Sequence, residues 1–484
     1  MWFIVGALAC GESTKDGQPA DSPGLAETGD TAAGAPDPFA ARPDRSGGLT
    51  NVSADLDAIL EHGALQGGCD AWRSSPEDEQ KRLLCGKWMF FYETFGTEEV
   101  PRALVDFVLD GFVEDVGPAF SSYGLIPDPS SEHGYPLGMA LGPGEEGLAF
   151  TCASCHLARL PDGRYAVGAP NHQYDYGTHN LAMALLPLAA MESMTGAEVD
   201  ELARADIQPL LDRLAGDSSL QLSFLGLLFS LLGKEAPTFS AESQRHYAEW
   251  LPGTQDFMIE PLPVDDEVHT VSKISALYGL PTPEEAEAAG MAHAMLGWTG
   301  NTRSLPGFVR LFDQLGGGDG PNYSDEQLAP LVDYINSLAV PSPPPADEDA
   351  IARGGEIFVD AGCLGCHSAP GGGGLTLYDY AEIGTDDALA RWMDADGDGA
   401  PCCDASLGED ALTGQLKSPR LWGLWAMERF LHNGAVSSLE ELVCLDGPRT
   451  PISAQAMGND GHLYGCDTLS EDEKRDLLVY LRAH

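Results

Sequence analysis

The chain has 484 residues, of which 43% are hydrophobic, so it is long enough for two or three domains with buried cores. Acidic residues outnumber basic ones by 75 to 26, which gives a formal net charge of −49 at pH 7. A surface this acidic repels nucleic acid and anionic lipid head groups, so we expect neither as a partner. It attracts a basic soluble partner, such as a small electron carrier. The alternative interpretation is that the acidic surface only keeps the protein soluble.

The chain begins with the apolar run 2–9, which is followed by Cys10. This run is long enough for the hydrophobic region of a signal peptide and too short to span a bilayer. Residues 7–10 resemble a lipobox, in which Cys10 becomes the lipidated first residue, although no positive charge precedes them. We therefore predict that residues 1–10 direct export to the periplasm or cell envelope, with lipid at Cys10 as the only membrane anchor. Plain export or a misassigned start codon are the alternatives.

Composition and helical patterning divide the rest of the chain. Residues 11–50 are rich in Gly, Ala, Pro and Asp and lack periodicity, which predicts a flexible tether. Folded sequence is expected from residue 51 onward, and Ser75 followed by Pro76 indicates the start of a helix. The apolar stretch 219–233 predicts a buried helix.

A proline-rich linker at residues 341–345 separates two unequal parts, 51–340 and 346–484. Each part ends in a similar helix, with a serine N-cap, acidic residues in the first turn and a tyrosine ten residues later. The two pairs are Ser324 with Tyr334 and Ser470 with Tyr480. This internal repeat predicts a mainly α protein built from two copies of one module, the first of them enlarged.

The sequence Cys-x-x-Cys-His occurs once in each part. The residues are Cys152, Cys155 and His156 in the first motif and Cys363, Cys366 and His367 in the second. A redox dithiol needs only the cysteines, and a zinc site needs a fourth ligand at a recognisable spacing. A c-type haem uses all three residues, because the cysteines bond to the porphyrin and the histidine binds the iron. We therefore predict two covalently attached haems.

The ligand on the opposite side of each iron decides function, because a six-coordinate iron transfers electrons while an open one binds peroxide or dioxygen. For the second haem we predict His462, which lies in a polar, glycine-flanked loop, with His432 as the alternative. For the first haem the candidates are His172 and His179, then Met183. An open iron is equally compatible with the sequence.

Six cysteines remain besides Cys10 and the two motifs, and an even number suits disulfides in an oxidising compartment. They are Cys69, Cys85, Cys402, Cys403, Cys444 and Cys466. We expect Cys69 to pair with Cys85, since they flank one short segment. A bond between adjacent cysteines is strained, so we expect residues 402 and 403 to bond to residues 444 and 466, in an order that the spacing leaves open.

The segment 393–404 contains Asp394, Asp396 and Asp398 at alternate positions before a glycine, a pattern that suits Ca²⁺. The glutamate that completes an EF-hand loop is absent, because its position is Ala405. A calcium site and an acidic loop tied down by disulfides are the two interpretations.

Tryptophans occur near the predicted haem ligands. Trp422 and Trp425 lie three residues apart, shortly before His432. An aromatic ring between two haems relays electrons or carries a radical, although core packing is the commoner role. Trp298 is a candidate for the pocket of the first haem.

These features resemble the bacterial di-haem cytochrome c peroxidase and MauG superfamily. Besides the paired motifs, the segment 416–443 follows that family's pattern from a Lys-x-Pro-x-Leu to a His-(Asp/Asn)-Gly. The matching positions are Lys417, Pro419, Leu421, Phe430, His432, Gly434, Val436 and Leu439. The branch that it most resembles is the rubber-oxygenase-like one, whose axial-histidine loop is similar to residues 459–465. The resemblance is strong over 345–484 and fair over 149–180.

The resemblance implies two cytochrome c-like domains and an oxidoreductase of the cytochrome c peroxidase type. Electrons would enter at the second haem and pass to the first, which would reduce peroxide or activate dioxygen. Asp446 stands where classical peroxidases have an axial methionine, which implies two histidine ligands and a lower potential for the second haem. A non-catalytic electron-transfer cytochrome with both irons six-coordinate is the alternative. Residues 180–300 offer no landmark, so no substrate-pocket residue is carried over.

Overall fold

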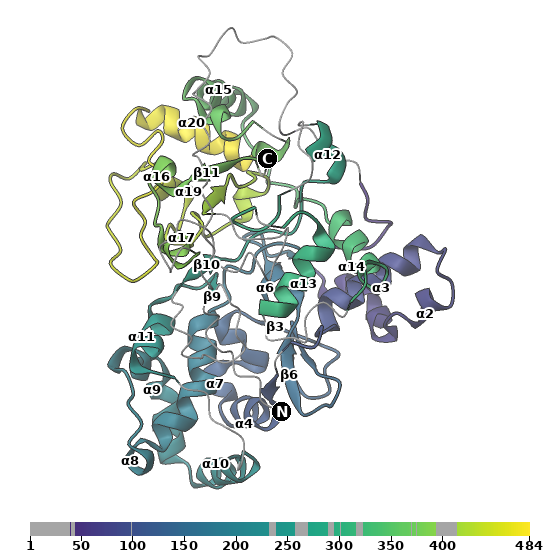
Figure 1. Cartoon of the computed structure of the whole chain (residues 1–484), viewed down its shortest axis with the longest axis vertical. Helices are drawn as coiled ribbons and strands as arrows, with labels where there is room; N and C mark the ends of the chain where they lie inside the picture. Colours follow the sequence, from purple (N-terminus) through teal and green to yellow (C-terminus); the bar gives the residue numbers. More distant parts are fainter. Residues whose placement is uncertain are drawn as a thin grey trace, which may run out of the picture.

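The computed structural model describes residue 39 and residues 44–97, 99–231, 239–256, 270–288, 295–300, 302–315, 323–368, 370–373, 375–393 and 414–484. These residues form a mainly helical protein with several small antiparallel sheets (Figure 1). The helices of nine residues or more are α3 (Glu79–Tyr92), α4 (Arg102–Gly111), α7 (Tyr176–Ala190), α9 (Glu201–Gly216), α10 (Ser218–Ser230), α11 (Ala241–Glu249), α13 (Leu305–Leu315), α14 (Asp325–Ser337), α15 (Glu348–Asp360) and α20 (Glu471–Arg482).

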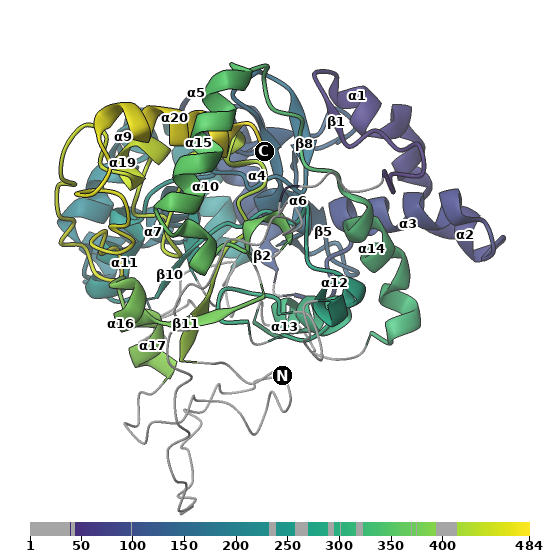
Figure 2. The ribbon, with the colours of Figure 1, turned by 90° about the horizontal axis from the view of Figure 1, so that it is seen from above.

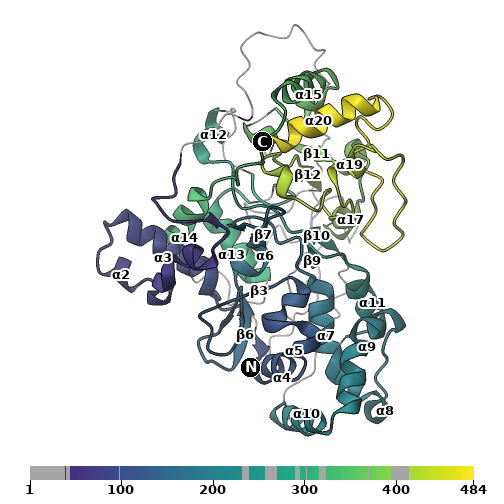
Figure 3. The same cartoon turned by 180° about the vertical axis from the view of Figure 1, so that it is seen from behind.

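The strands are short, and several pair with strands distant in the sequence, such as Val52 with Ala166. The three-stranded sheets have the orders β1-β8-β7 (Val52–Ser53, Tyr165–Val167, Leu157–Arg159) and β2-β6-β5 (Val100–Pro101, Gly147–Phe150, Met139–Leu141). The strand pairs are β3-β4 (Ile126–Pro127, Pro136–Leu137), β9-β10 (Thr254–Asp256, Val271–Lys273) and β11-β12 (Leu377–Asp379, Gln415–Lys417). Strands β9 and β10 lie near the middle of the molecule, between its two ends (Figures 1 and 3).

Three large hydrophobic clusters form most of the core of the described residues, besides a small one of Tyr380, Leu389 and Leu416. One is built mainly on α4, α7, α9, α10 and α11 at the lower end of Figure 1. A second joins α3 and α14 to the sheet that contains β7 and β8. The third packs α15 against α20 at the opposite end of the molecule, where Figures 1 and 3 both place these two helices side by side.

The predicted repeat has a matching tertiary structure, because each closing helix crosses an earlier helix at a glycine. A Cβ atom on Gly86 in α3 would lie 1.9 Å from the carbonyl oxygen of Pro330 and 2.7 Å from the Cβ of Tyr334 in α14. A Cβ atom on Gly354 in α15 would lie 2.2 Å from the carbonyl oxygen of Asp476 and 2.6 Å from the Cβ of Tyr480 in α20. Only glycine permits backbones this close. Figure 2 shows both helix pairs from above.

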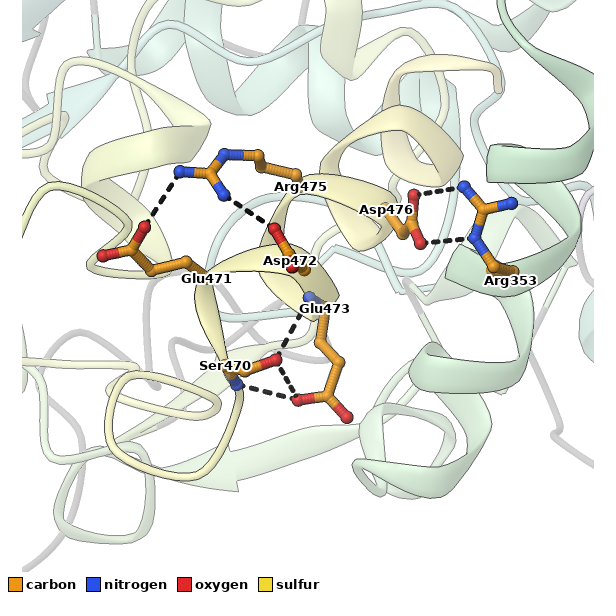
Figure 4. Close-up of polar contacts among 7 residues, drawn as sticks. All are labelled: Arg353, Ser470, Glu471, Asp472, Glu473, Arg475 and Asp476. Atoms are coloured by element: carbon orange, nitrogen blue, oxygen red, sulfur yellow. Dashed lines mark hydrogen bonds and ion pairs between the residues drawn. The ribbon is translucent and has the colours of Figure 1, made fainter.

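Capping and an ion pair stabilise these crossings. Ser324 and Ser470 are the N-caps of α14 and α20, as predicted, and each forms a capping box, with Gln327 and Glu473 respectively. Arg353 of α15 forms a two-pronged ion pair with Asp476 of α20, with its Nε 2.6 Å from a carboxylate oxygen (Figure 4).

Two helices differ from the sequence predictions. Helix α3 begins at Glu79 with Asp78 as its N-cap, because Asp78 accepts a hydrogen bond from the main-chain N–H of Lys81, so Ser75 and Pro76 precede the helix. Helix α10 is not buried all round, because only one of its faces packs inward. Leu222 and Phe229 on its other face are 71% and 72% exposed.

The predicted tether also makes contacts before residue 51. Phe39 is buried and its ring stacks on that of His484, with ring centres 4.2 Å apart. Leu49 is buried as well. Packing therefore begins inside the segment 11–50. Within the described ranges, no helix has the length and hydropathy needed to cross a lipid bilayer.

Candidate functional site: a cavity between the two Cys-x-x-Cys-His motifs

The first motif forms the short helix α6 (Cys152–His156), directly after β6. Both of its thiols are free, and the Sγ of Cys155 donates to the Oε1 of Gln255 at 3.1 Å. Burial raises the pKa of Cys152 to about 12 and that of Cys155 to about 11. A redox-active dithiol needs a lowered thiol pKa, so these surroundings do not favour that interpretation.

The second motif follows α15 directly and also has free thiols, on Cys363 and Cys366. The Nδ1 of His367 donates a hydrogen bond to the carbonyl oxygen of Gly372, which fixes the ring and leaves Nε2 with its lone pair. Metal-binding histidines characteristically donate their other ring N–H to a carbonyl in this way. Burial lowers the pKa of His367, so the imidazole is neutral.

The imidazole rings of His462 and His367 lie close together. The two ring centres lie 6.3 Å apart, and the rings are inclined at 68°. A nitrogen lies about 1.1 Å from the centre of an imidazole ring whose bonds are about 1.3 Å long. A metal–imidazole bond is about 2.0 Å. One metal ion shared by two opposed imidazoles therefore requires ring centres about 6.2 Å apart, which agrees with the observed separation.

The loop that carries His462 is held from several sides. His462 has a positive φ of 54°, an uncommon conformation for a residue with a side chain, and its N–H donates to the carbonyl of Ile383 at 3.0 Å. Gly461 permits this approach, because a Cβ atom there would lie 2.5 Å from the Cα of Thr385. Backbone strain that the surroundings maintain is characteristic of functional sites.

Arg449 contributes most to holding this loop. Its guanidinium donates to main-chain carbonyls of Glu441 at 3.1 Å, Leu442 at 2.6 Å, Asn459 at 2.7 Å, Gly461 at 2.6 Å and His462 at 3.1 Å. The side chain of Arg449 thus ties the residues around His462 to a neighbouring segment. The sequence analysis did not single out Arg449. The one signal that could have done so is that basic residues are few in this acidic chain.

A disulfide closes the same loop. Cys444 bonds to Cys466, so the prediction that these two bond to Cys402 and Cys403 is wrong. Their Cα atoms are 5.0 Å apart because the intervening residues fold back as one loop around His462. The predicted bond between Cys69 and Cys85 is confirmed. Cys10, Cys402 and Cys403 lie outside the described residues, as do Asp394, Asp396 and Asp398 of the predicted calcium site.

A single cavity of about 340 Å³ connects the two motifs. His156 of the first motif and His367 of the second both line it, together with His462 and His432. Burial lowers the pKa of His156, His432 and His462 to about 4 each, so all three are neutral near pH 7. Neutral imidazoles are the form that binds a metal.

Two lysines and two tryptophans also line the cavity. Lys273 and Lys417 line it together with a third cationic residue, Arg420. Trp298 lies next to both lysines, since its Nε1 donates to the carbonyl of Lys273 and its carbonyl accepts from the N–H of Lys417. Trp422 packs against Gly279 and Gly371. The sequence marked Trp298 and Trp422, whereas the role of Lys273, in an apolar stretch, was missed.

Trp425 and His432 have different surroundings. Trp425 does not line the cavity, and its Nε1 donates to the carbonyl of Pro341 in the linker at 3.0 Å. His432 does line it, with its ring at a right angle to that of Tyr380 and its Nδ1 buried without a hydrogen-bond partner. The carbonyl of His432 accepts from the N–H of Lys273 at 2.7 Å.

The candidate ligands of the predicted first haem are not among the residues that line this cavity. Both ring nitrogens of His172 are engaged by the main chain, since Nδ1 accepts from the N–H of Glu428 and Nε2 donates to the carbonyl of Ile274, each at 3.0 Å. His179 bonds through Nδ1 to the hydroxyl of Tyr174, and its Nε2 is buried without a partner. Met183 is buried in the core cluster around α7.

The described residues contain no cluster of three or more His, Cys, Asp or Glu side chains arranged to hold a metal ion. No family model matches the chain, and no curated protein matches it. Among solved structures, the hydrazine synthase of Kuenenia stuttgartiensis, in crystals pressurised with xenon, is similar at 19% identity and a TM-score of 0.29. The match covers 49% of this chain and 79% of that one. At this TM-score the likeness carries no argument about fold or function.

Proposed function

We propose that this chain is an exported cytochrome that carries two covalently bound c-type haems in two cytochrome c-like modules. The observation that carries the proposal is the neighbouring pair His367 and His462, whose ring separation of 6.3 Å suits one shared metal ion. Cys363 and Cys366 lie next to His367 with free thiols, which is the donor set for a c-type haem. The repeated crossing of a glycine by a tyrosine-bearing helix supports a second module of the same kind.

The residues present fit such a group. In the second module, Cys363 and Cys366 would hold the porphyrin, while His367 and His462 would bind the iron. In the first, Cys152, Cys155 and His156 would do the same on one side only. When bound, a haem supplies one-electron transfer, and at an iron with a free coordination position it also binds peroxide or dioxygen.

The side chains around the two proposed haem sites suit them to different tasks. His367 is oriented by the carbonyl of Gly372, and His462 is held by its loop, which supports these two histidines as the ligands of the proposed second haem. Of the candidates for the free side of the first site, both nitrogens of His172 are engaged and His179 lies outside the cavity. These features favour an oxidoreductase of the peroxidase type, with the second site as the point of electron transfer.

Export and partner choice follow from composition and disulfides. The bonds Cys69–Cys85 and Cys444–Cys466 are compatible with an oxidising compartment, such as the periplasm or cell envelope. The net charge of −49 favours a basic soluble electron donor. Lipid attached to Cys10, which follows the lipobox-like residues, would be the anchor.

Haem attachment is testable by mass and colour. The chain is produced with the cytochrome c maturation machinery, and the covalent haem of each variant is counted by intact mass and by the pyridine haemochrome spectrum. The variants are the double alanine substitutions of Cys152 with Cys155, of Cys363 with Cys366 and, as a control, of Cys69 with Cys85. We expect two haems in the unaltered chain and in the control, and one in each motif variant. A colourless chain at the bare polypeptide mass refutes the proposal.

The type of activity is testable by ligand binding. Reduced protein is exposed to carbon monoxide, and the ferric spectrum is examined for a high-spin component. We expect carbon monoxide to bind in the variant that retains only the first motif, because its second axial side is free. Two low-spin haems that do not bind carbon monoxide would instead identify a non-catalytic electron-transfer cytochrome.

A further inference from the structure

Lys273 and Lys417 bring positive charge into the cavity of an otherwise acidic protein. Lys273 ends strand β10 and is 8% exposed, and Lys417 ends strand β12 and is half-buried. Both line the cavity. Trp298 is hydrogen-bonded to the main chain of both lysines. Its Nε1 donates to the carbonyl of Lys273 at 3.2 Å, and its carbonyl accepts from the N–H of Lys417 at 2.7 Å.

Neither ammonium group forms an ion pair with an acidic side chain of the described segments, although Glu382 also lines the cavity. The Nζ of Lys273 lies 5.2 Å from the ring centre of Trp298 and 5.9 Å from that of Phe430. The Nζ of Lys417 donates to the carbonyl of Met295 at 3.2 Å. No ion pair between described residues includes either lysine, although acidic residues outnumber basic ones by 75 to 26 over the whole chain.

The cost of burying these two ammonium groups would be reduced by a bound anion. Removing an ammonium group from water is unfavourable unless a partner charge compensates for it. A contact with an aromatic face offsets only part of that cost. Consistently, burial lowers the pKa of Lys273 to about 8, and burial together with the nearby charge of Arg420 lowers that of Lys417 to about 7. A bound anion would remove this penalty at both residues.

We propose that Lys273 and Lys417 form a carboxylate-binding site in the cavity and that the carboxylates are those of a bound haem. This inference rests on the proposed function. Each haem bears two propionate groups, and the cavity that holds the lysines also reaches His156 and His367, the predicted iron ligands. A free organic acid has the same chemistry, so the experiment must separate these two sources.

The direct readout is the resonance Raman band of the haem propionate bend, which shifts when the hydrogen bonds to those carboxylates change. We compare Lys273→Met, Lys417→Met and the double variant with the unaltered protein. Lys81→Met is the control, since it removes the same charge from an exposed ion pair with Asp78. Lys273→Arg retains the charge and shows whether a variant has merely misfolded.

We expect the propionate band to shift in both single methionine variants, and further in the double variant, while the control and Lys273→Arg keep it close to its original position. We also expect lower midpoint potentials in the methionine variants, because loss of a positive charge stabilises the ferric state. If the band is unchanged but succinate binds the unaltered protein and not the double variant, measured by calorimetry, the site takes a free acid and the haem assignment is overturned.

Failure of the site and failure of the proposed function give different results. A full complement of covalent haem with an unchanged band and no succinate binding overturns the carboxylate site and leaves the cytochrome intact. Absence of covalent haem from the unaltered protein overturns the cytochrome itself.

Discussion

Arg449 offers a sharp test of how the chain presents His462. The change is Arg449→Met, which removes the guanidinium and keeps most of the length of the side chain. Five main-chain carbonyls lose their donor, and three of them belong to residues 459, 461 and 462. No other side chain in the described segments forms as many hydrogen bonds with this loop, so the loss of Arg449 should act first on the position of His462.

The magnitude follows from the hydrogen bonds. A hydrogen bond to a charged donor contributes about 1.5–3 kcal/mol, and the loss is smaller where water replaces the donor. Arg449 is half-buried, so water reaches some of the freed carbonyls. We expect the arrangement that presents His462 to lose roughly 3 kcal/mol. That corresponds to a shift of about a hundredfold in the equilibrium between held and released His462.

The assay is the ferric spectrum of the second haem, recorded in the variant that lacks the cysteines of the first motif. We expect Arg449→Met to convert low-spin signal to high-spin signal and added imidazole to restore the low-spin form. Arg475→Met is the matched control, because Arg475 lies exposed on α20 in ion pairs with Glu471 and Asp472 (Figure 4). Such exposed pairs contribute little. A low-spin spectrum unchanged by Arg449→Met would refute this reasoning.

Three further predictions concern packing, the disulfide and pH. Gly354→Ala should lower the free energy of unfolding, measured in urea, by about 1–3 kcal/mol, because the added Cβ meets the backbone of α20. Gly355→Ala is the control and should leave that free energy unchanged, because its Cβ meets only the movable ring of Tyr480. Replacing Cys444 and Cys466 by serine should cost roughly 3 kcal/mol of stability through the freed loop and raise the high-spin fraction; equal melting curves would contradict this. Burial lowers the pKa of His179 in the folded protein to about 3. Between about pH 6.5 and pH 3 the unfolded state therefore binds a proton that the folded state does not. The free energy of unfolding then falls by about 1.4 kcal/mol for each unit by which the pH falls. His179→Phe should make the dependence of urea unfolding on pH shallower, and an unchanged slope would count against it.

The sequence by itself determined the features whose signals are local. The two Cys-x-x-Cys-His motifs could be recognised in the sequence because each proposed haem donor set spans only five residues. The bond between Cys69 and Cys85 was predictable because its partners flank one short segment. Ser324 and Ser470 were identifiable as N-caps because capping depends on residues within one turn. His462 was predicted as a ligand from its loop, and that role stays a prediction although the structure places it close to His367.

The tertiary structure alone decided which distant residues meet. The bond between Cys444 and Cys466, the five contacts of Arg449 and the meeting of Lys273 with Lys417 beside Trp298 depend on how separate segments pack. The exposed face of α10 was equally hidden, because an apolar sequence does not say which of its faces finds a neighbour. The physical reason is that helix caps and covalent motifs are set by neighbours along the chain, whereas burial and charge balance depend on neighbours in space.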